Sequence, residues 1–163
     1  MQNPMFEEGG WCDRWSPTFL SVLRIMTALL FLSHGTSKIL GVPLSTASFP
    51  PPWTQFWVAG MLELIGGTLL LIGLFTRPTA FILAGEMAVA YWLVHAPDNF
   101  WPALNRGETA ILFCFIFLYT VFAGPGPWSV DAWLRRRRAE EGPDSYYEGL
   151  RRGGTHHGAR VAE

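Results

Sequence analysis

The sequence predicts an all-α fold: an integral membrane, antiparallel four-helix bundle with a partly disordered cytoplasmic C-terminal tail. Half of the 163 residues are hydrophobic, and only 15% are charged, against about 25% in a typical soluble domain. Residues 17–124 carry eight charged side chains, whereas residues 125–163 carry thirteen. Long apolar segments fill the charge-poor stretch, which suits a bilayer better than water. The net charge of −1 excludes a generally basic nucleic-acid binder.

The chain divides into three parts by composition. A cytoplasmic N-terminal segment (1–17) precedes a membrane domain (18–124), and a basic cytoplasmic tail (125–163) follows. The four expected spans are 18–40, 53–75, 78–97 and 108–124. Their lengths bracket the roughly 20 residues that an α-helix needs to cross the hydrocarbon core. Four such apolar segments would leave a soluble protein with almost no polar surface.

Proline, glycine and tryptophan mark the ends of these spans. Pro50–Pro52 stiffens the connection before the second span, and Pro78 lies in the first turn of the third, where its missing N–H is harmless. Gly124–Pro127 ends the fourth span abruptly. Seven of the eight tryptophans fall near predicted ends or in connections: Trp11, Trp15, Trp53, Trp57, Trp101, Trp128 and Trp133. This distribution is typical of the aromatic belt at a membrane interface.

Arginines set the expected orientation. In a four-span chain Arg14, Arg77 and Arg135–Arg138 lie on one side, whereas the opposite side receives Arg106, with Lys38 at a helix end. The positive-inside rule therefore predicts a multi-pass protein of the cell (inner or plasma) membrane with both termini cytoplasmic.

The tail begins with a helix signal. Ser129 is suited to cap a short helix that runs through Asp131 and Trp133 into Arg135–Arg138. We interpret the arginine run as a stop-transfer signal that contacts anionic membrane lipid, at about 1 kcal/mol per charge. After Glu140 the mixed charge and glycine predict disorder.

The candidate intramembrane site consists of five ionisable side chains from the first three spans: Arg24, His34, Lys38, Glu63 and Glu86. On a helix, Lys38 lies about 40° around the axis from both Arg24 and His34, so the first span carries one polar stripe. We expect Glu63 and Glu86 to face the bundle interior near mid-depth, with Arg24 extending toward Glu86. Ionisable groups in a membrane favour a functional site by default.

Other roles for these groups stay open. They are also suited to fix helix packing through ion pairs, and Arg24 and Lys38 have the length to snorkel to the interfaces. At the outer boundary lie Arg106 and Glu108. Glu108 is a candidate partner for Lys38, and so is Glu63 in the second span. No Glu-x-x-His pair supports a metal site, and no residue is predicted to be catalytic.

With these residues in view, the chain resembles the DoxX family of small four-helix membrane proteins over about residues 24–134. The matching stretches are Arg24–Ile25, Phe31–Lys38, Glu63–Gly67, Gly73–Arg77, Asn105–Glu108, Gly124–Gly126 and Ser129–Asp131. Arg106 stands where a small residue is expected between Asn105 and Gly107. The resemblance implies an antiparallel bundle of four membrane helices.

The family is named for a membrane subunit associated with quinone-linked oxidation of sulfur compounds. The resemblance therefore implies a quinone-interacting or anchoring subunit of a membrane oxidoreductase assembly, an accessory subunit rather than a stand-alone enzyme. Quinone is the expected ligand and a cytoplasmic oxidoreductase subunit the expected partner. The sequence has no CxxC motif or nucleotide-binding glycine loop, so no intrinsic cofactor is expected. A small-solute or proton carrier, a structural or assembly membrane protein, and a homo-oligomer remain alternatives.

Overall fold

The computed structural model describes residues 10–42 and 50–140, and within these ranges it contains helices and no strand. The helices are α1 (Trp11–Leu40), α2 (Gln55–Ile72), α3 (Thr76–Ala90), the π-helical turn η1 (Tyr91–His95), α4 (Pro102–Asn105), α5 (Glu108–Ala123) and α6 (Val130–Glu140). The predicted all-α class is confirmed for this part of the chain. Most of the predicted N-terminal segment and the predicted disordered tail after Glu140 lie outside the described residues.

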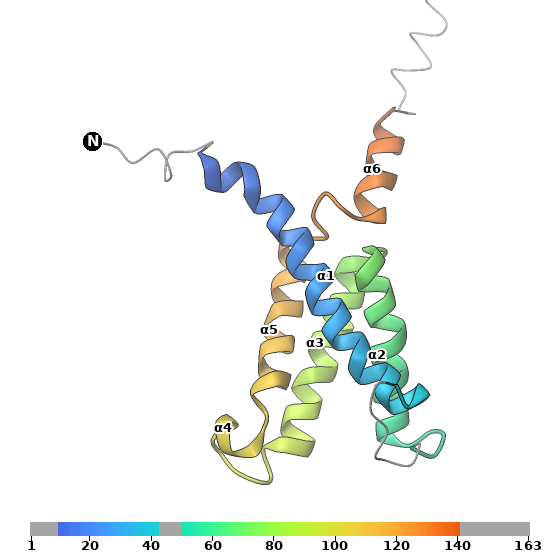
Figure 1. Cartoon of the computed structure of the whole chain (residues 1–163), viewed down its shortest axis with the longest axis vertical. Helices are drawn as coiled ribbons and strands as arrows, with labels where there is room; N and C mark the ends of the chain where they lie inside the picture. Colours follow the sequence, from blue (N-terminus) through green and yellow to red (C-terminus); the bar gives the residue numbers. More distant parts are fainter. Residues whose placement is uncertain (1–9, 43–49, 141–163) are drawn as a thin grey trace, which may run out of the picture.

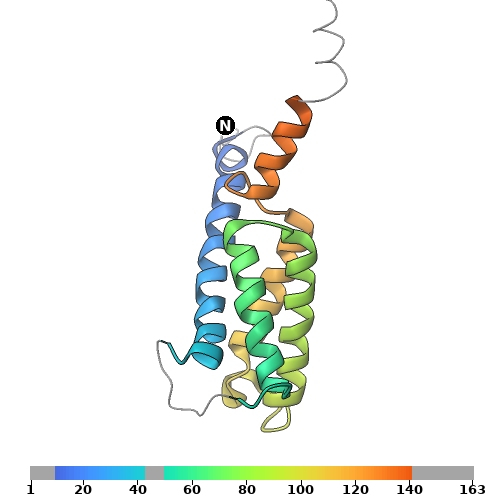
Figure 2. The same ribbon diagram turned by 90° about the vertical axis from the view of Figure 1, so that its right-hand side faces the viewer.

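The four long helices lie side by side and alternate in direction (Figures 1 and 2). α1 packs along α2 and α3 along α5, while α2 also contacts α3. One end of this arrangement holds the start of α1, the α2–α3 turn and α6, and the other end holds α4, the end of α1 and the start of α2 (Figure 1). Two of the described helices, α1 and α2, are long and apolar enough to cross a membrane, and α5 is a shorter apolar helix.

The largest differences from the predicted spans are at the start of α1 and the end of α2. α1 begins at Trp11 instead of residue 18. Pro17 therefore lies inside the helix, in its second turn, where its missing N–H removes one backbone hydrogen bond. α2 stops at Ile72, since Gly73 adopts a left-handed conformation (φ 70°) and its amide closes on the carbonyls of Leu69 and Leu70. The third predicted span, 78–97, corresponds to α3 followed by η1.

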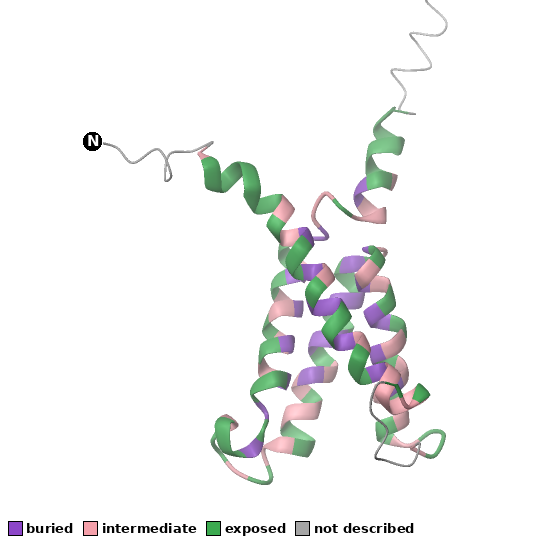
Figure 3. Ribbon diagram, in the orientation of Figure 1, coloured by how far each residue is buried: buried purple, intermediate pink, exposed green. Residues whose placement is uncertain are grey.

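Aromatic rings from α1 and α5 form the centre of the core. Phe31 meets Phe113 and Phe117 edge to face, with ring centroids 5.2 and 4.8 Å apart. All three rings are buried, and they belong to a cluster of buried apolar residues from the four long helices. Figure 3 marks the buried positions of these helices in purple. This cluster joins the α1–α2 pair to the α3–α5 pair.

Polar contacts hold α6 against the end of the bundle. The Ser129 hydroxyl accepts a hydrogen bond from the amide of Ala132 at 3.1 Å, which confirms the predicted helix cap. The Asp131 carboxylate accepts hydrogen bonds from the amides of Phe75 (3.0 Å) and Thr76 (2.9 Å). α3 has no side-chain cap of its own, so a residue from α6 satisfies its first amides.

These contacts predict an acid-sensitive docking of α6. Partial burial acts to raise the pKa of Asp131, but the amide hydrogen bonds from Thr76 and Phe75 and the charge of Arg135 outweigh it and hold the pKa below its usual range. The carboxylate therefore stabilises the fold above about pH 4 and loses this effect as the pH falls through its lowered pKa. We expect the difference in thermal unfolding midpoint between the parent and Asp131→Ala to shrink at acid pH. A difference that stays constant from about pH 7 to 3 would contradict this.

Candidate functional site

A cavity of about 760 Å³ lies between α1, α2, α3 and α5, toward the end of the bundle that carries α4. Its walls are largely apolar and include Phe31, Phe56, Leu62, Met87 and Phe113. Cavities of about 300–1,000 Å³ with apolar walls and a few polar groups are typical of small-molecule sites. The cavity is thus large enough for a ring-sized ligand.

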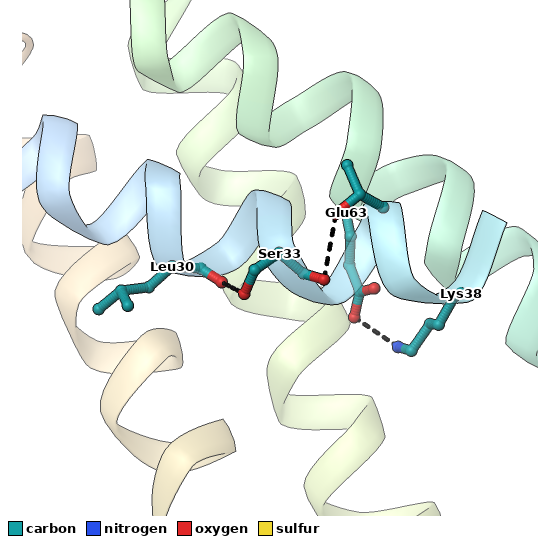
Figure 4. A network of polar contacts seen from close by, with 5 residues as sticks. Leu30, Ser33, Lys38 and Glu63 are labelled. Atoms are coloured by element: carbon teal, nitrogen blue, oxygen red, sulfur yellow. Dashed lines mark hydrogen bonds and ion pairs between the residues drawn. The ribbon is translucent and has the colours of Figure 1, made fainter. Parts of the chain in front are cut away.

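Polar side chains from every wall reach the same cavity: His34, Lys38, Gln55, Glu63, Glu86, His95, Arg106 and Thr109. The Nζ atom of Lys38 lies 2.6 Å from Oε1 of Glu63. Figure 4 shows Glu63 reaching from α2 to Lys38 in the last turn of α1. The Glu63 side chain is only 3% exposed, so this ion pair compensates a deeply buried charge.

Three carboxylate oxygens at the cavity have no protein partner. Among the described residues, Oε2 of Glu63 and both oxygens of Glu86 are buried without a hydrogen bond. Counted along the helices, Glu63 lies about 12 Å from the start of α2 and Glu86 about 13 Å from the end of η1. The two carboxylates therefore form an inner, acidic part of the cavity, facing the interior as predicted.

Histidine and arginine side chains line other parts of the cavity. His34 lies one turn before Lys38 on α1, and its ring meets that of Phe113 edge to face at 6.0 Å. His95 closes η1, and its Nδ1 atom lies 3.0 Å from the carbonyl oxygen of Asn105, which fixes the imidazole. Arg106 follows α4 in a left-handed conformation (φ 59°). The cavity thus combines two carboxylates, two cations and two imidazoles.

Comparison with known proteins identifies the family. The family model DoxX matches residues 19–96. An uncharacterized protein of Haemophilus influenzae is 42% identical over 126 residues, which cover 73% of this chain and 92% of the relative. The chain belongs to the DoxX family. No solved structure matches it.

Two further relatives of this DoxX chain are named for the membrane. An uncharacterized membrane protein of Mycobacterium tuberculosis is 26% identical, covering 74% of this chain and 84% of the relative. The inner membrane protein YqjF of Escherichia coli is 29% identical, covering 71% and 92%. The chain is therefore a membrane protein, and the relatives' names assign it no reaction.

Arg24, although predicted for the intramembrane site, lies elsewhere in this DoxX chain. Its guanidinium does not extend toward Glu86 but binds main-chain carbonyls at the α6 end of the bundle. Nε donates to Pro125 (2.8 Å), Nη2 to Trp128 (2.5 Å), and Nη1 to Leu71 (2.8 Å) and Leu70. The side chain is 2% exposed. Arg24 joins α1, the end of α2 and the segment before α6, and we assign it a structural role.

The outer-boundary residues divide between the cavity and the surface. Lys38 pairs with Glu63 and not with Glu108, which is exposed at the first turn of α5 and does not line the cavity. The expected Lys38–Glu108 pair is therefore wrong, because α1 packs along α2 and contacts α5 far less. Arg106 does line the cavity.

Among the ionisable residues of the cavity, His95 is the one that sequence reasoning missed. It lies near the end of the predicted span 78–97, and a histidine at the end of a membrane span is not by itself a sign of a binding site. The signal lies in the backbone: η1 is a π-helical turn, which changes the direction of its side chains relative to α3 and often occurs at functional sites. Within the residues described, no group of three His, Cys, Asp or Glu side chains is placed to hold a metal ion.

Proposed function

We propose that this DoxX-family protein binds the head group of a quinone-class molecule in the cavity and serves as the quinone-interacting or anchoring subunit of a membrane oxidoreductase assembly. The observation that carries the proposal is the cavity itself, with apolar walls around Lys38, His34 and the unpartnered Glu86 carboxylate. A quinone has a flat ring with two polar groups and a long apolar tail, so its chemistry matches both parts of the cavity.

The residues present fit such a head group. Glu86 has two buried oxygens without a partner among the described residues, and His34 both donates and accepts hydrogen bonds. Phe31 and Phe113 offer ring faces or edges beside them. When bound, a quinone supplies two-electron, two-proton redox chemistry. The chain's own contribution is to orient the ring and to hold its polar groups away from water.

The proposal includes four membrane spans, formed by α1, α2, α3 with η1, and α5. Large apolar side chains point outward from each of them, for example Leu30 (58% exposed), Ile65 (54%), Phe81 (65%) and Phe115 (65%). Such surfaces are rare in water and ordinary in lipid. α3 and η1 have 15 and five residues, so together they reach about 30 Å, the thickness of the hydrocarbon core.

Both termini are proposed to be cytoplasmic, since Arg77 and the arginines of α6 lie at the same end (Figure 1). In a chain with Cys12 and Cys114 replaced by serine, we expect Asp98→Cys to react with a membrane-impermeant maleimide added outside intact cells. Arg138→Cys is the matched control at the other end, and it reacts only after the cells are opened. The reverse labelling pattern would overturn the orientation.

A cytoplasmic oxidoreductase subunit is proposed to dock on α6. The side chains of Arg135–Arg138 are at least partly exposed, and the guanidinium of Arg137 lies over the ring of Trp133 at 4.3 Å, suited to acidic protein or anionic lipid. The cavity lies toward the opposite end of the bundle. A quinone diffuses within the bilayer, so partner docking and ligand binding need not share a face.

The test is ligand binding by the purified protein. We expect quinone to co-purify in mild detergent and to be detected by mass spectrometry, and His34→Ala to lower the affinity for an added short-chain quinone about tenfold, the effect of one lost hydrogen bond. Ser33→Ala is the control, because Ser33 donates to the carbonyl of Leu30 and does not line the cavity. If no quinone binds to the folded parent, the proposal fails.

A proton or small-solute carrier is the second candidate, favoured by the two carboxylates that face one cavity. It predicts transport into proteoliposomes that Glu86→Gln abolishes. Quinone binding without transport would exclude this candidate. Absence of both would favour an assembly factor whose polar groups only fix the bundle.

A further inference from the structure

The acidic part of the cavity has an excess of hydrogen-bond acceptors. Within residues 10–42 and 50–140, Oε2 of Glu63 and both oxygens of Glu86 are buried and lack a donor. Glu63 is already paired with the Lys38 ammonium through Oε1 and is 3% exposed. Buried acceptors without a donor destabilise the site, so a ligand that supplies donors gains affinity there.

This excess persists in either protonation state of Glu86. If Glu86 is ionised, all three unpaired oxygens only accept hydrogen bonds. If Glu86 takes a proton, one of its oxygens donates, and its other oxygen and Oε2 of Glu63 still only accept. The Glu86 proton satisfies at most one of these two oxygens, so at least one acceptor remains for the ligand to satisfy.

Among the described residues no donor reaches these three oxygens, although Lys38, His34 and Arg106 have further N–H groups and line the same cavity. Lys38 binds Glu63 at 2.6 Å, and Nδ1 of His95 lies against the carbonyl oxygen of Asn105. Apolar side chains, among them Met87, Phe31 and Phe113, make up much of the remaining wall. In this arrangement the donors to Oε2 of Glu63 and to Glu86 come from the polar end of the ligand or from water that the ligand displaces.

We propose that the cavity selects the reduced, hydroxyl-bearing form of its ligand, a quinol or related phenol, over the oxidised quinone. The inference rests on the proposed function and adds to it the oxidation state of the ligand that the cavity binds more tightly. A quinol has two hydroxyl groups that donate to Glu86 and Glu63, whereas a quinone has only carbonyl acceptors. The quinone would therefore leave at least one buried acceptor unpaired.

The experiment compares one ring in its two oxidation states. The full chain in lipid nanodiscs is titrated under anaerobic conditions with 2,3-dimethoxy-5-methylbenzoquinone and with its hydroquinone. We expect the hydroquinone to bind at least about tenfold more tightly, the effect of one satisfied buried acceptor. We expect Glu86→Gln to bring the ratio of the two dissociation constants toward one, because the amide supplies a donor to the quinone carbonyl.

Glu108→Gln is the matched control, since Glu108 is exposed, lies outside the cavity and should leave the ratio unchanged. The ratio measured on the parent decides the inference even if Glu86→Gln does not fold. Equal binding of the two forms would overturn the preference for the reduced ring and leave the proposed function standing. Binding of neither form would overturn both.

Discussion

Arg24→Met should cost more than about 3 kcal/mol of stability, the largest loss expected from any single substitution at the α6 end of the bundle. The guanidinium donates to four main-chain carbonyls, those of Leu70, Leu71, Pro125 and Trp128. Methionine fills similar space but donates nothing, so the carbonyls of Leu71, Pro125 and Trp128 lose the Arg24 donor, and the Leu70 carbonyl keeps the Gly73 amide. We expect a lower thermal unfolding midpoint in detergent and a smaller monodisperse fraction on size-exclusion chromatography.

Arg14→Met is the control for this prediction. Arg14 lies on the same helix but is exposed, so its replacement should change stability by no more than about 0.5 kcal/mol. The stability of Arg24→Lys should lie between those of Arg24→Met and Arg14→Met. An ammonium keeps the positive charge but lacks the planar guanidinium that reaches several carbonyls at once. If Arg24→Met unfolds at the same temperature as the parent, the structural role assigned to Arg24 is wrong.

Arg24 also shows where sequence reasoning stops. Helical periodicity correctly placed Arg24 on the polar stripe of α1, and a charged partner such as Glu86 was the natural expectation. Its actual partners are main-chain carbonyls, which every residue carries and no sequence pattern marks. Only the docking of the segment before α6 against α1 and α2 brings these carbonyls to the guanidinium.

The partner of Lys38 was open for a similar reason. Its place near the end of the predicted first span allowed Glu63 or Glu108 as partner, and the choice depends on which helix α1 packs along. By contrast, the helical segments and the Ser129 cap were predictable, because apolar run length and local capping chemistry depend on neighbouring residues alone. Long-range packing and the changed side-chain direction at η1 depend on contacts between distant residues, so they were not predictable in this way.

Gly35→Ala should destabilise the fold by at least about 2 kcal/mol, because a side chain there meets backbone. A Cβ atom added at Gly35 would lie 2.6 Å from the amide nitrogen of Leu64 and 3.0 Å from the carbonyl carbon of Glu63. Neither atom belongs to a flexible side chain, so α1 and α2 must move apart. We expect a lower unfolding temperature in detergent and weaker ligand binding, since Lys38 and Glu63 pair across the same contact.

Gly85→Ala makes the same chemical change on α3, but it should raise the stability of the fold or leave it unchanged. No heavy atom lies within 4 Å of a Cβ added at Gly85. Alanine in a helix interior is about 0.5–1 kcal/mol more favourable than glycine, so this variant should be as stable as the parent or more so. If both alanine variants shift the unfolding temperature equally and in the same direction, close approach of α1 to α2 at Gly35 does not determine stability. Opposite shifts would show that the Lys38–Glu63 side of the cavity depends on a helix contact that only glycine permits.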